Sequence, residues 1–286
     1  MNATRAQTYS PTSVAPLPWG RWSLRVVALI WLGVMIALPL AVLFEHGLRE
    51  GVVKFWAEIT NPVALAAVRL TIFAAAVMTL INAVMGTLTA YVLTRYRFFG
   101  SRLFNSLIDL PFAIPTLVTG VMLVVLYGPQ RALGAWFDHY LGLKIIFAPP
   151  GIILALLFIT FPFVTRAVQP VLMAIEREQE EAAWTLGASR WKTFTRVILP
   201  MITPAIVSGA LLSFARALGE FGSIVVVAGN IPRSTLTAPV YVFGQIESQN
   251  QMGASAVSIM LLALSFTLML LVDWMQKKRG GEHVAG

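Results

Sequence analysis

The chain has 286 residues, of which 57% are hydrophobic and only 12% are charged, and its mean hydropathy is +0.76. Soluble domains carry about 25% charged residues, so this composition excludes an ordinary soluble domain and indicates a membrane protein. The chain contains no cysteine, which excludes disulfides, thiolate metal sites and a cysteine nucleophile. The net charge of +8 is compatible with nucleic acid, but the positions of the basic residues explain it differently.

Six segments are apolar and long enough to cross a bilayer, which takes about 20 residues per helix. In chain order they are residues 26–44, 70–94, 103–127, 145–165, 202–228 and 254–272. The first is too long for the core of a signal peptide and lacks a following cleavage site, so we expect it to be retained. The sequence therefore predicts an all-α, polytopic membrane protein with one six-helix transmembrane domain at 26–275.

Basic residues divide unevenly between the two sides of such a bundle. With both termini on one side, fourteen arginines and lysines fall on that side and five on the other: Arg49, Lys54, Arg131, Lys144 and Arg233. The positive-inside rule then places both termini in the cytoplasm and attributes the charge to anionic membrane lipid, not to nucleic acid. Residues 1–25 are predicted to be a disordered cytoplasmic tail, and 276–286 a short one.

The longest inner loop, residues 173–200, has a helical pattern in its middle. Good helix formers fill residues 176–186, and Gly187 then offers a left-handed stop. Ser189 is a plausible N-cap for a second short helix that ends near Arg196. Two short helices before the fifth span are therefore expected.

Small residues mark one face of the first of these helices. Ala183 and Gly187 are four residues apart and share a face, so another protein surface can approach the backbone there. Glu180 and Glu181 are available to donors on that partner. An amphipathic helix lying on the bilayer is the alternative, but the apolar side chains of this segment do not form one wide stripe.

Glu181-Ala182-Ala183 is followed after three residues by Gly187, and after nine more by Val197-Ile198-Leu199-Pro200. This spacing resembles the signature loop of bacterial ABC importer permeases, with valine in place of the first isoleucine. The resemblance implies a type I importer permease fold in which the loop is a coupling helix that docks on a separate ATPase subunit. The implied docking residues are Glu180, Glu181, Ala182, Ala183 and Gly187, and Leu199 and Pro200 join them to the fifth span.

Further runs resemble the T-type permease subunit of sulfate/thiosulfate importers: residues 94–98, 107–116, 161–166, 168–172, 214–222 and 228–232. The resemblance begins near residue 60. W-type and molybdate permeases share the run that holds Arg216 and Glu220, so the 109–116 run is what favours the T-type. The implied partners are a W-type permease chain, an ATPase dimer that uses ATP and Mg, and a periplasmic sulfate/thiosulfate-binding protein, at the bacterial inner membrane.

Two ionisable residues lie inside the predicted fifth span. Arg216 and Glu220 are four apart and can pair, and charge at that depth normally faces a bundle interior or a wet cavity. Either Arg216 attracts an anion while Glu220 keeps its binding weak, or the pair only ties helices together. The remaining candidates for the translocation pathway are Asp109, Pro111, Pro115, Thr116, Gly222 and Ser223.

The third span carries several of these candidates near its start. Asp109 lies near the interface, where capping or a salt bridge with Arg102 is expected. Pro111 and Pro115 predict a kinked helix, and interrupted helices often mark a transport route. The outer loop 229–253 is expected either to face a periplasmic binding protein or to fold back toward the pore.

The chain has no Gly-x4-Gly-Lys-Ser/Thr sequence, so we expect no enzyme activity and no bound cofactor, and any ATP hydrolysis belongs to a partner. One alternative is a permease for another oxyanion, molybdate or tungstate. A secondary transporter would need ionisable residues in several spans and internal repeats. An intramembrane enzyme would need a nucleophile or metal motif at membrane depth, and no predicted span contains a histidine.

Overall fold

The computed structural model describes residues 18–280, with side chains described for 22–271, and this part is nearly all helix. The chain divides into two compact units, Met1–His46 and Gly47–Gly286. Within the described residues, five helices are long and apolar enough to cross a membrane. A sixth span results if the bent pair α7 (Thr116–Tyr127) and α8 (Ala132–Leu141), which meet at 61°, counts as one.

The first unit is essentially one apolar helix. It consists of α1 (Pro18–Leu32), a π-helical turn at Gly33–Ala37 and most of α2 (Leu38–Leu48). The predicted span at 26–44 lies within it. Residues 18–25 are helical, whereas the sequence predicted a disordered tail there. Pro18 does not prevent this, because proline is tolerated in the first turn of a helix. The rest of that predicted tail lies outside the described residues.

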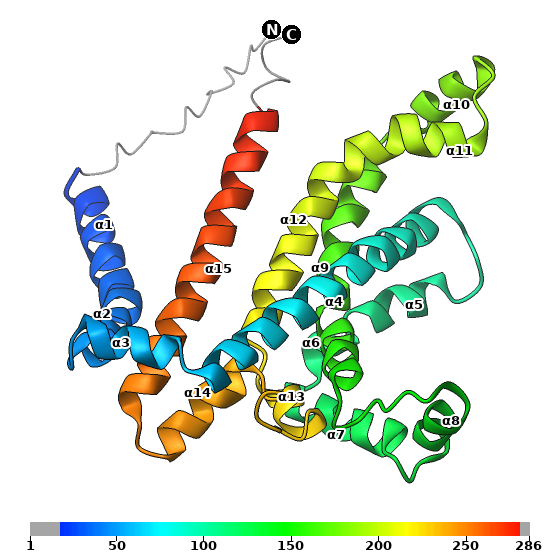
Figure 1. Cartoon of the computed structure of the whole chain (residues 1–286). Coiled ribbons are helices and arrows are strands. Elements are labelled where there is room, and N and C mark those ends of the chain that lie inside the picture. Colours follow the sequence, from blue (N-terminus) through cyan, green and yellow to red (C-terminus); the bar gives the residue numbers. More distant parts are fainter. Residues whose placement is uncertain (1–17, 281–286) are drawn as a thin grey trace, which may run out of the picture. The chain divides into compact units, whose positions relative to one another are not determined.

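Three long helices form the centre of the second unit. They are α4 (Pro62–Arg95), α9 (Pro149–Ala174) and α12 (Leu199–Leu218), and α9 packs along both of the others (Figure 1). Small residues allow this close packing, since a Cβ on Gly86 of α4 would lie 2.8 Å from Val164 Cβ. The fully buried Met78, Leu156 and Leu218 contribute to the core between these helices.

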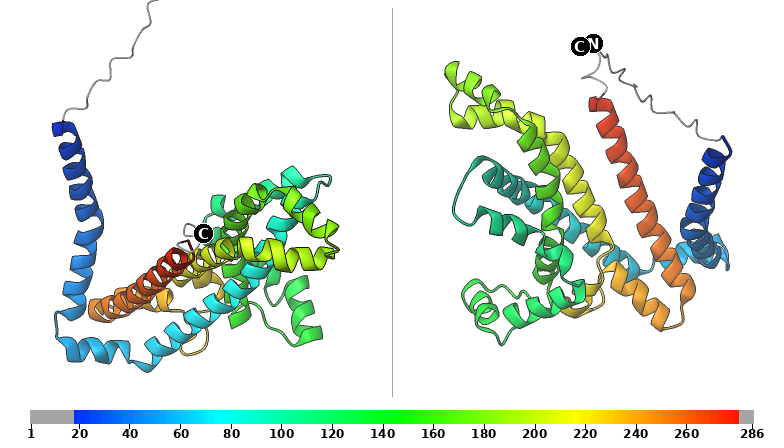
Figure 2. Two further views of the ribbon diagram at one scale, coloured as in Figure 1. Left: turned by 90° about the horizontal axis from the view of Figure 1, so that it is seen from above. Right: turned by 180° about the vertical axis from the view of Figure 1, so that it is seen from behind.

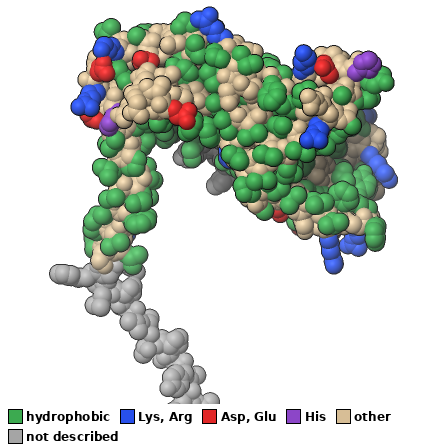
Figure 3. Space-filling model, turned by 90° about the horizontal axis from the view of Figure 1, so that it is seen from below, with side chains coloured by type: hydrophobic (Ala, Val, Ile, Leu, Met, Phe, Trp, Pro, Cys, Tyr) green, Lys and Arg blue, Asp and Glu red, His purple; other side chains and the backbone are tan. Residues whose placement is uncertain are grey.

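The two ends of this bundle differ in character. The short helices α10 (Arg177–Thr185) and α11 (Arg190–Thr193) project from one end, and α7, α8 and α13 (Gly222–Val227) lie at the other (Figure 1, Figure 2). The helix α15 (Gln251–Gly280) packs against α12, α14 (Ala238–Glu247) and α3 (Val52–Ile59). Hydrophobic side chains cover much of the surface seen in Figure 3, as a bilayer requires.

Three of the predicted spans are longer in the structure. The helix α4 begins at Pro62 because Asn61 caps it, accepting a hydrogen bond from Val63 N at 2.9 Å. The helix α9 continues past residue 165 to Ala174, so Arg166 is inside a helix and not in a loop. The helix α15 reaches Gly280, which makes part of the predicted C-terminal tail helical, whereas residues 281–286 lie outside the described part.

The predicted third span is wrong as a single helix. Residues 103–127 fall into α5 (Ser101–Ile108), α6 (Leu110–Ala113) and α7. Proline disfavours a helical conformation in the residue before it, and Ile114, which precedes Pro115, is extended with φ −87° and ψ 126°. The expected kink is therefore a true interruption.

The predicted fifth span is wrong at both ends. One continuous helix runs over Arg190–Leu218, with a π-helical turn at Phe194–Ile198 between α11 and α12. Such turns accommodate bends in long helices. Leu199 and Pro200 therefore lie inside a helix and not at a junction, and the chain leaves this helix at Gly219 before entering α13.

The predicted outer loop at 229–253 folds back onto the bundle. It contains α14, whose Ala238 and Tyr241 are buried. The backbone N of Ala238 donates to Thr71 Oγ1 of α4 at 2.8 Å, which fixes the start of α14 against that helix. The loop therefore packs on its own bundle, and both expectations for it, contact with a binding protein and folding toward the pore, stay predictions.

Candidate translocation and coupling sites

Arg216 and Glu220 form the ion pair that the sequence predicted. Arg216 Nη2 lies 2.9 Å from Glu220 Oε2. Arg216 is in the last turn of α12 and Glu220 directly precedes α13, so each charge suits the dipole of its helix end. The other carboxylate oxygen of Glu220 accepts hydrogen bonds from Ser223 N and Ser223 Oγ, both at 3.0 Å. The pair thus lies at a break between helices, not within a continuous span.

The two partners differ in exposure. The Glu220 side chain is 2% exposed, whereas that of Arg216 is 37% exposed. Glu220 is fully engaged by Arg216 and Ser223, but Nε and Nη1 of Arg216 have no hydrogen-bond partner among the described residues. The arrangement presents an accessible cation with spare donors, backed by a buried carboxylate. This chemistry suits transient binding of an oxyanion.

The starts of α7 and α13 meet at this site through small residues. A Cβ on Gly222 would collide with Thr116 Oγ1 and lie 3.1 Å from Leu117 N, and a Cβ on Gly120 would lie 2.7 Å from Ser223 O. The glycines therefore permit direct backbone contact between the helices. The structure thus brings together the predicted Thr116, which follows Pro115, with Gly222 and Ser223, beside the Arg216–Glu220 pair.

Asp109 pairs with Arg166 and not with Arg102, as the sequence had suggested. Arg166 Nε donates to Asp109 Oδ1 at 2.7 Å, and Arg166 Nη2 to Asp109 Oδ2 at 2.6 Å. The guanidinium also donates to Asn105 Oδ1, Asn105 O and Gln169 Oε1 at 2.6–2.9 Å. All five N–H groups of Arg166 are used, so it clamps α5 to α9 and has no donor left for an anion.

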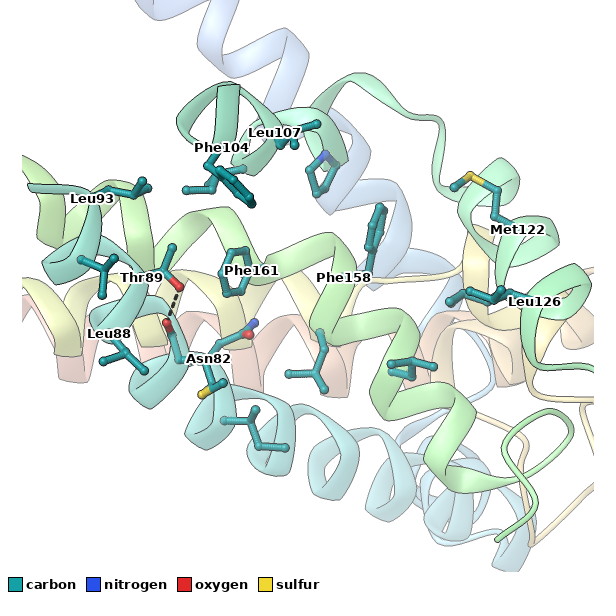
Figure 4. A pocket seen from close by; sticks show the side chains of 18 of the residues that line it. Asn82, Leu88, Thr89, Leu93, Phe104, Leu107, Met122, Leu126, Phe158 and Phe161 are labelled. Carbon is teal, nitrogen blue, oxygen red and sulfur yellow. Dashed lines mark hydrogen bonds between the residues drawn. The ribbon is translucent and has the colours of Figure 1, made fainter. Parts of the chain in front are cut away.

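A large cavity lies beside this clamp. It has a volume of about 1120 Å³ and is lined by α4, α5, α7 and α9. Pro111, another predicted pathway residue, is on its wall. Figure 4 shows Phe158 and Phe161 of α9 pointing into it. Its lining contains no charged side chain, and only Asn82, Thr89 and Tyr127 are polar, so the cavity is unsuitable for a dehydrated anion.

The predicted helix at 176–186 is confirmed as α10, with its boundaries within one residue. Gly187 has φ +83°, the left-handed conformation expected of a helix stop, and Ala188 N donates to Ala183 O at 3.0 Å. The Ser189 hydroxyl oxygen caps α11 by accepting from Lys192 N at 3.3 Å. The second helix does not end near residue 196, however, but continues into α12.

The projecting tip combines acidic, small and apolar residues. Glu181, Ala182 and Gly187 are exposed, and Ala183 is half-buried. Three large apolar side chains are also exposed there: Trp184 (45%), Leu186 (88%) and Trp191 (72%). A patch of this kind marks a surface for another protein or a membrane.

Glu180 faces the bundle instead of a partner. Its Oε1 lies 2.6 Å from Arg95 Nη2, and the two side chains are 9% and 11% exposed. This differs from the expectation that Glu180 binds donors on a docking protein. Sequence reasoning missed Arg95 and Arg166 because both lay just outside predicted span ends. The three-residue spacing of Arg166 and Gln169, which share a helix face, was the available signal.

Among residues 22–271, whose side chains are described, no three His, Cys, Asp or Glu side chains come together to hold a metal ion. The interrupted helices, the charged pair at a helix break and the projecting loop are features of a multi-pass membrane permease. Residues 82–280 match the family described as binding-protein-dependent transport system inner membrane component. The chain belongs to this family.

Known relatives agree over nearly the whole chain. A probable sulfate transport system permease protein cysT of Nephroselmis olivacea is 43% identical over 255 residues, covering 89% of this chain and 88% of that protein. The sulfate transport system permease protein CysT of Escherichia coli (strain K12) is 39% identical over 259 residues, covering 91% and 93%. A bacterial ABC transporter that imports alginate has the same fold, with a TM-score of 0.76, 17% identity and coverage of 91% and 96%.

Proposed function

We propose that this chain is the T-type permease subunit of an ATP-driven importer that moves sulfate or thiosulfate across a bacterial inner membrane. The main support is its 39–43% sequence identity to sulfate permeases over about nine-tenths of both chains. In this proposal both termini are cytoplasmic, as the distribution of arginine and lysine favours. The projecting α10 is then on the cytoplasmic side.

The proposed assembly contains several partners. A paralogous W-type permease completes the pathway, and a dimeric ATPase supplies ATP hydrolysis with Mg, since this chain lacks a phosphate-binding loop. A periplasmic binding protein delivers the anion. Exposed Glu181 and Ala182 of α10, and Gly187 just after it, support docking to the ATPase, because small residues allow close approach and Glu181 offers an acceptor.

Arg216 is proposed to contact the anion in passage. It is accessible and has free N–H donors, whereas Arg166 has none left. Glu220 lowers the net positive charge at the site, so the anion is attracted but not retained. Gly222 and Ser223 supply the close backbone approach of α13 to α7 beside this site.

Uptake competition tests the proposed cargo. Labelled sulfate uptake is measured in cells that depend on this chain and its partners, with unlabelled thiosulfate, molybdate or tungstate added in excess. Thiosulfate is expected to compete strongly, and molybdate and tungstate weakly. Strong competition by molybdate or tungstate would instead assign the chain to an importer of those anions.

A further inference from the structure

The base of α10 holds a buried ion pair that joins distant parts of the sequence. Arg95 is the last residue of α4, and Glu180 is in α10. The 2.6 Å contact between Arg95 Nη2 and Glu180 Oε1 is almost inaccessible to solvent. The same nitrogen donates to the carbonyl oxygen of Ile175 at 3.3 Å, the residue that follows the end of α9. One guanidinium therefore connects α4, α9 and α10.

Aromatic side chains also pack the π-helical turn at Phe194–Ile198 against the end of α4, close to Arg95. Tyr91, one turn before Arg95, packs edge-on against Phe194 of the π-helical turn, with ring centroids 5.3 Å apart. It also contacts Tyr96 at 6.2 Å. A cavity of about 250 Å³ lies beside the pair and is lined by Arg95, Glu180 and residues from α4, α10 and α11. The base of α10 is therefore only partly filled by side chains.

Glu180 is the only buried residue of α10. The remainder of the helix is exposed, apart from the half-buried Ala183. The covalent connections of α10 lead to α9 and to α11, but not to α4. The Arg95–Glu180 pair is thus the direct polar link between α10 and α4, and a charge pair shielded from water is stronger than an exposed one.

We propose that Arg95 and Glu180 are positioning residues that transmit the movement of α10 to α4 during transport. This inference rests on the proposed function, in which α10 receives movement from the ATPase. Glu180 Oε1 accepts no hydrogen bond, so this link is an attraction between charges. In a site shielded from water that attraction is strong enough to hold α10 to the end of α4, and the two move together. Without the pair, α10 can tilt into the neighbouring cavity while α4 stays in place.

The first test uses the complete transporter, with its second permease, ATPase and binding protein, in proteoliposomes. Glu180→Gln and Arg95→Gln are each compared with Glu178→Gln, a matched change at an exposed position of α10. We expect ATP hydrolysis to persist while sulfate uptake per ATP falls about tenfold, within the range for residues that couple distant sites. The Glu178→Gln control should match the wild type.

Exchanging the charges, Arg95→Glu with Glu180→Arg, re-forms the ion pair and should restore most of the uptake per ATP. A merely structural role would lower hydrolysis and uptake together in the single variants. Unchanged uptake per ATP in both single variants would overturn the inference. So would a parallel loss of hydrolysis, uptake and assembly in both.

A distance measurement provides a second readout that does not depend on transport. The chain has no cysteine, so spin labels on Arg97→Cys and Glu178→Cys report the separation of the α4 end from α10. With the pair intact we expect one narrow distance that is the same with and without ATP, and a broad distribution in the Glu180→Gln background. A broad distribution with the pair intact would overturn the inference. Narrow distances in a wild-type complex that hydrolyses ATP but imports no sulfate would contradict only the proposed cargo.

Discussion

Arg166 and Arg216 each pair with a carboxylate, but they differ in how many guanidinium N–H groups remain free. Arg166 uses every guanidinium N–H within the protein, whereas Arg216 makes one ion pair and keeps donors free. Donor saturation, not charge alone, therefore separates a structural arginine from a candidate binding residue. Both arginines lie beside a carboxylate, and at Glu220, which is 2% exposed, the pairing matters most because an unpaired buried charge is costly.

Replacing Arg216 should lower transport without preventing assembly. We expect Arg216→Gln to reduce sulfate uptake about tenfold or more, equivalent to about 1.4 kcal/mol or more in the barrier. Because the single change leaves Glu220 buried without its partner, Arg216→Gln with Glu220→Gln should restore stability but not uptake. Uptake assays and co-purification of the complex measure both effects. Arg131→Gln, an exposed arginine elsewhere, serves as the control, and wild-type uptake by the double variant would contradict the role.

At the scale of elements, short contacts fix the interrupted third span. The clamp from Arg166 holds α5 and the break at Asp109 against α9. Glycines then bring the start of α7 against α13. The interruption is therefore held at both of its ends by contacts with α9 and α13.

The clamp predicts a stability effect at Asp109. Asp109→Asn removes the charge while keeping one acceptor, and we expect it to destabilise the complex by about 1–2 kcal/mol, a modest value because the carboxylate is half exposed. Thermal unfolding of the purified complex measures this loss. Arg102→Gln changes the partner first expected from sequence and should leave the melting temperature unchanged. A loss of stability in Arg102→Gln, with none in Asp109→Asn, would show that Asp109 pairs with Arg102 instead.

Because α7 and α13 touch through Gly222, a larger side chain at this position should destabilise the protein. Gly222→Ala would drive a Cβ into Thr116 Oγ1, and we expect a loss of about 1–3 kcal/mol from overpacking. Adding Thr116→Ala should recover part of it. Gly244→Ala is the matched control, because a Cβ on this α14 glycine meets nothing within 4 Å. Equal melting temperatures for the Gly222 and Gly244 variants would show that this contact is looser than described.

At the scale of the whole molecule, the two ends of the second unit hold different candidate sites. The free Arg216 donors lie where α12 ends, beside α7 and α13, and the projecting α10 lies at the opposite end (Figure 1). The long helices α4, α9 and α12 connect the two. In the proposed function, these helices would carry movement from one end to the other.

The docking surface can be tested with two glycines of similar backbone geometry. Gly187 and Gly142 both have positive φ, +83° and +61°, and neither has an atom within 4 Å of an added Cβ. Glutamate at either position therefore imposes comparable backbone strain. We expect Gly187→Glu to abolish co-purification with the ATPase and Gly142→Glu, at the end of α8, to preserve it. Normal co-purification and transport by Gly187→Glu would contradict the docking role of this face.

The sequence by itself determined the membrane class, five of the apolar helices, α10 with its glycine stop, and the Arg216–Glu220 pair. These features are local, because each follows from hydropathy or from side chains within four residues. It also carried the family resemblance that the comparisons confirm. The break in the third span at Ile114 and the end of the fifth at Gly219 were missed because hydropathy continues unchanged across both.

Tertiary structure alone decided the long-range partners. Arg166 lies 57 residues from Asp109, and Arg95 lies 85 residues before Glu180 in the sequence, so no local pattern pairs them. Packing of α6 on α9 brings Asp109 to Arg166, and the ends of α4 and α9 meet where Arg95 reaches Ile175 and Glu180. The inward position of Glu180 likewise depends on Arg95 at the end of α4, a partner that helix propensity within α10 cannot reveal.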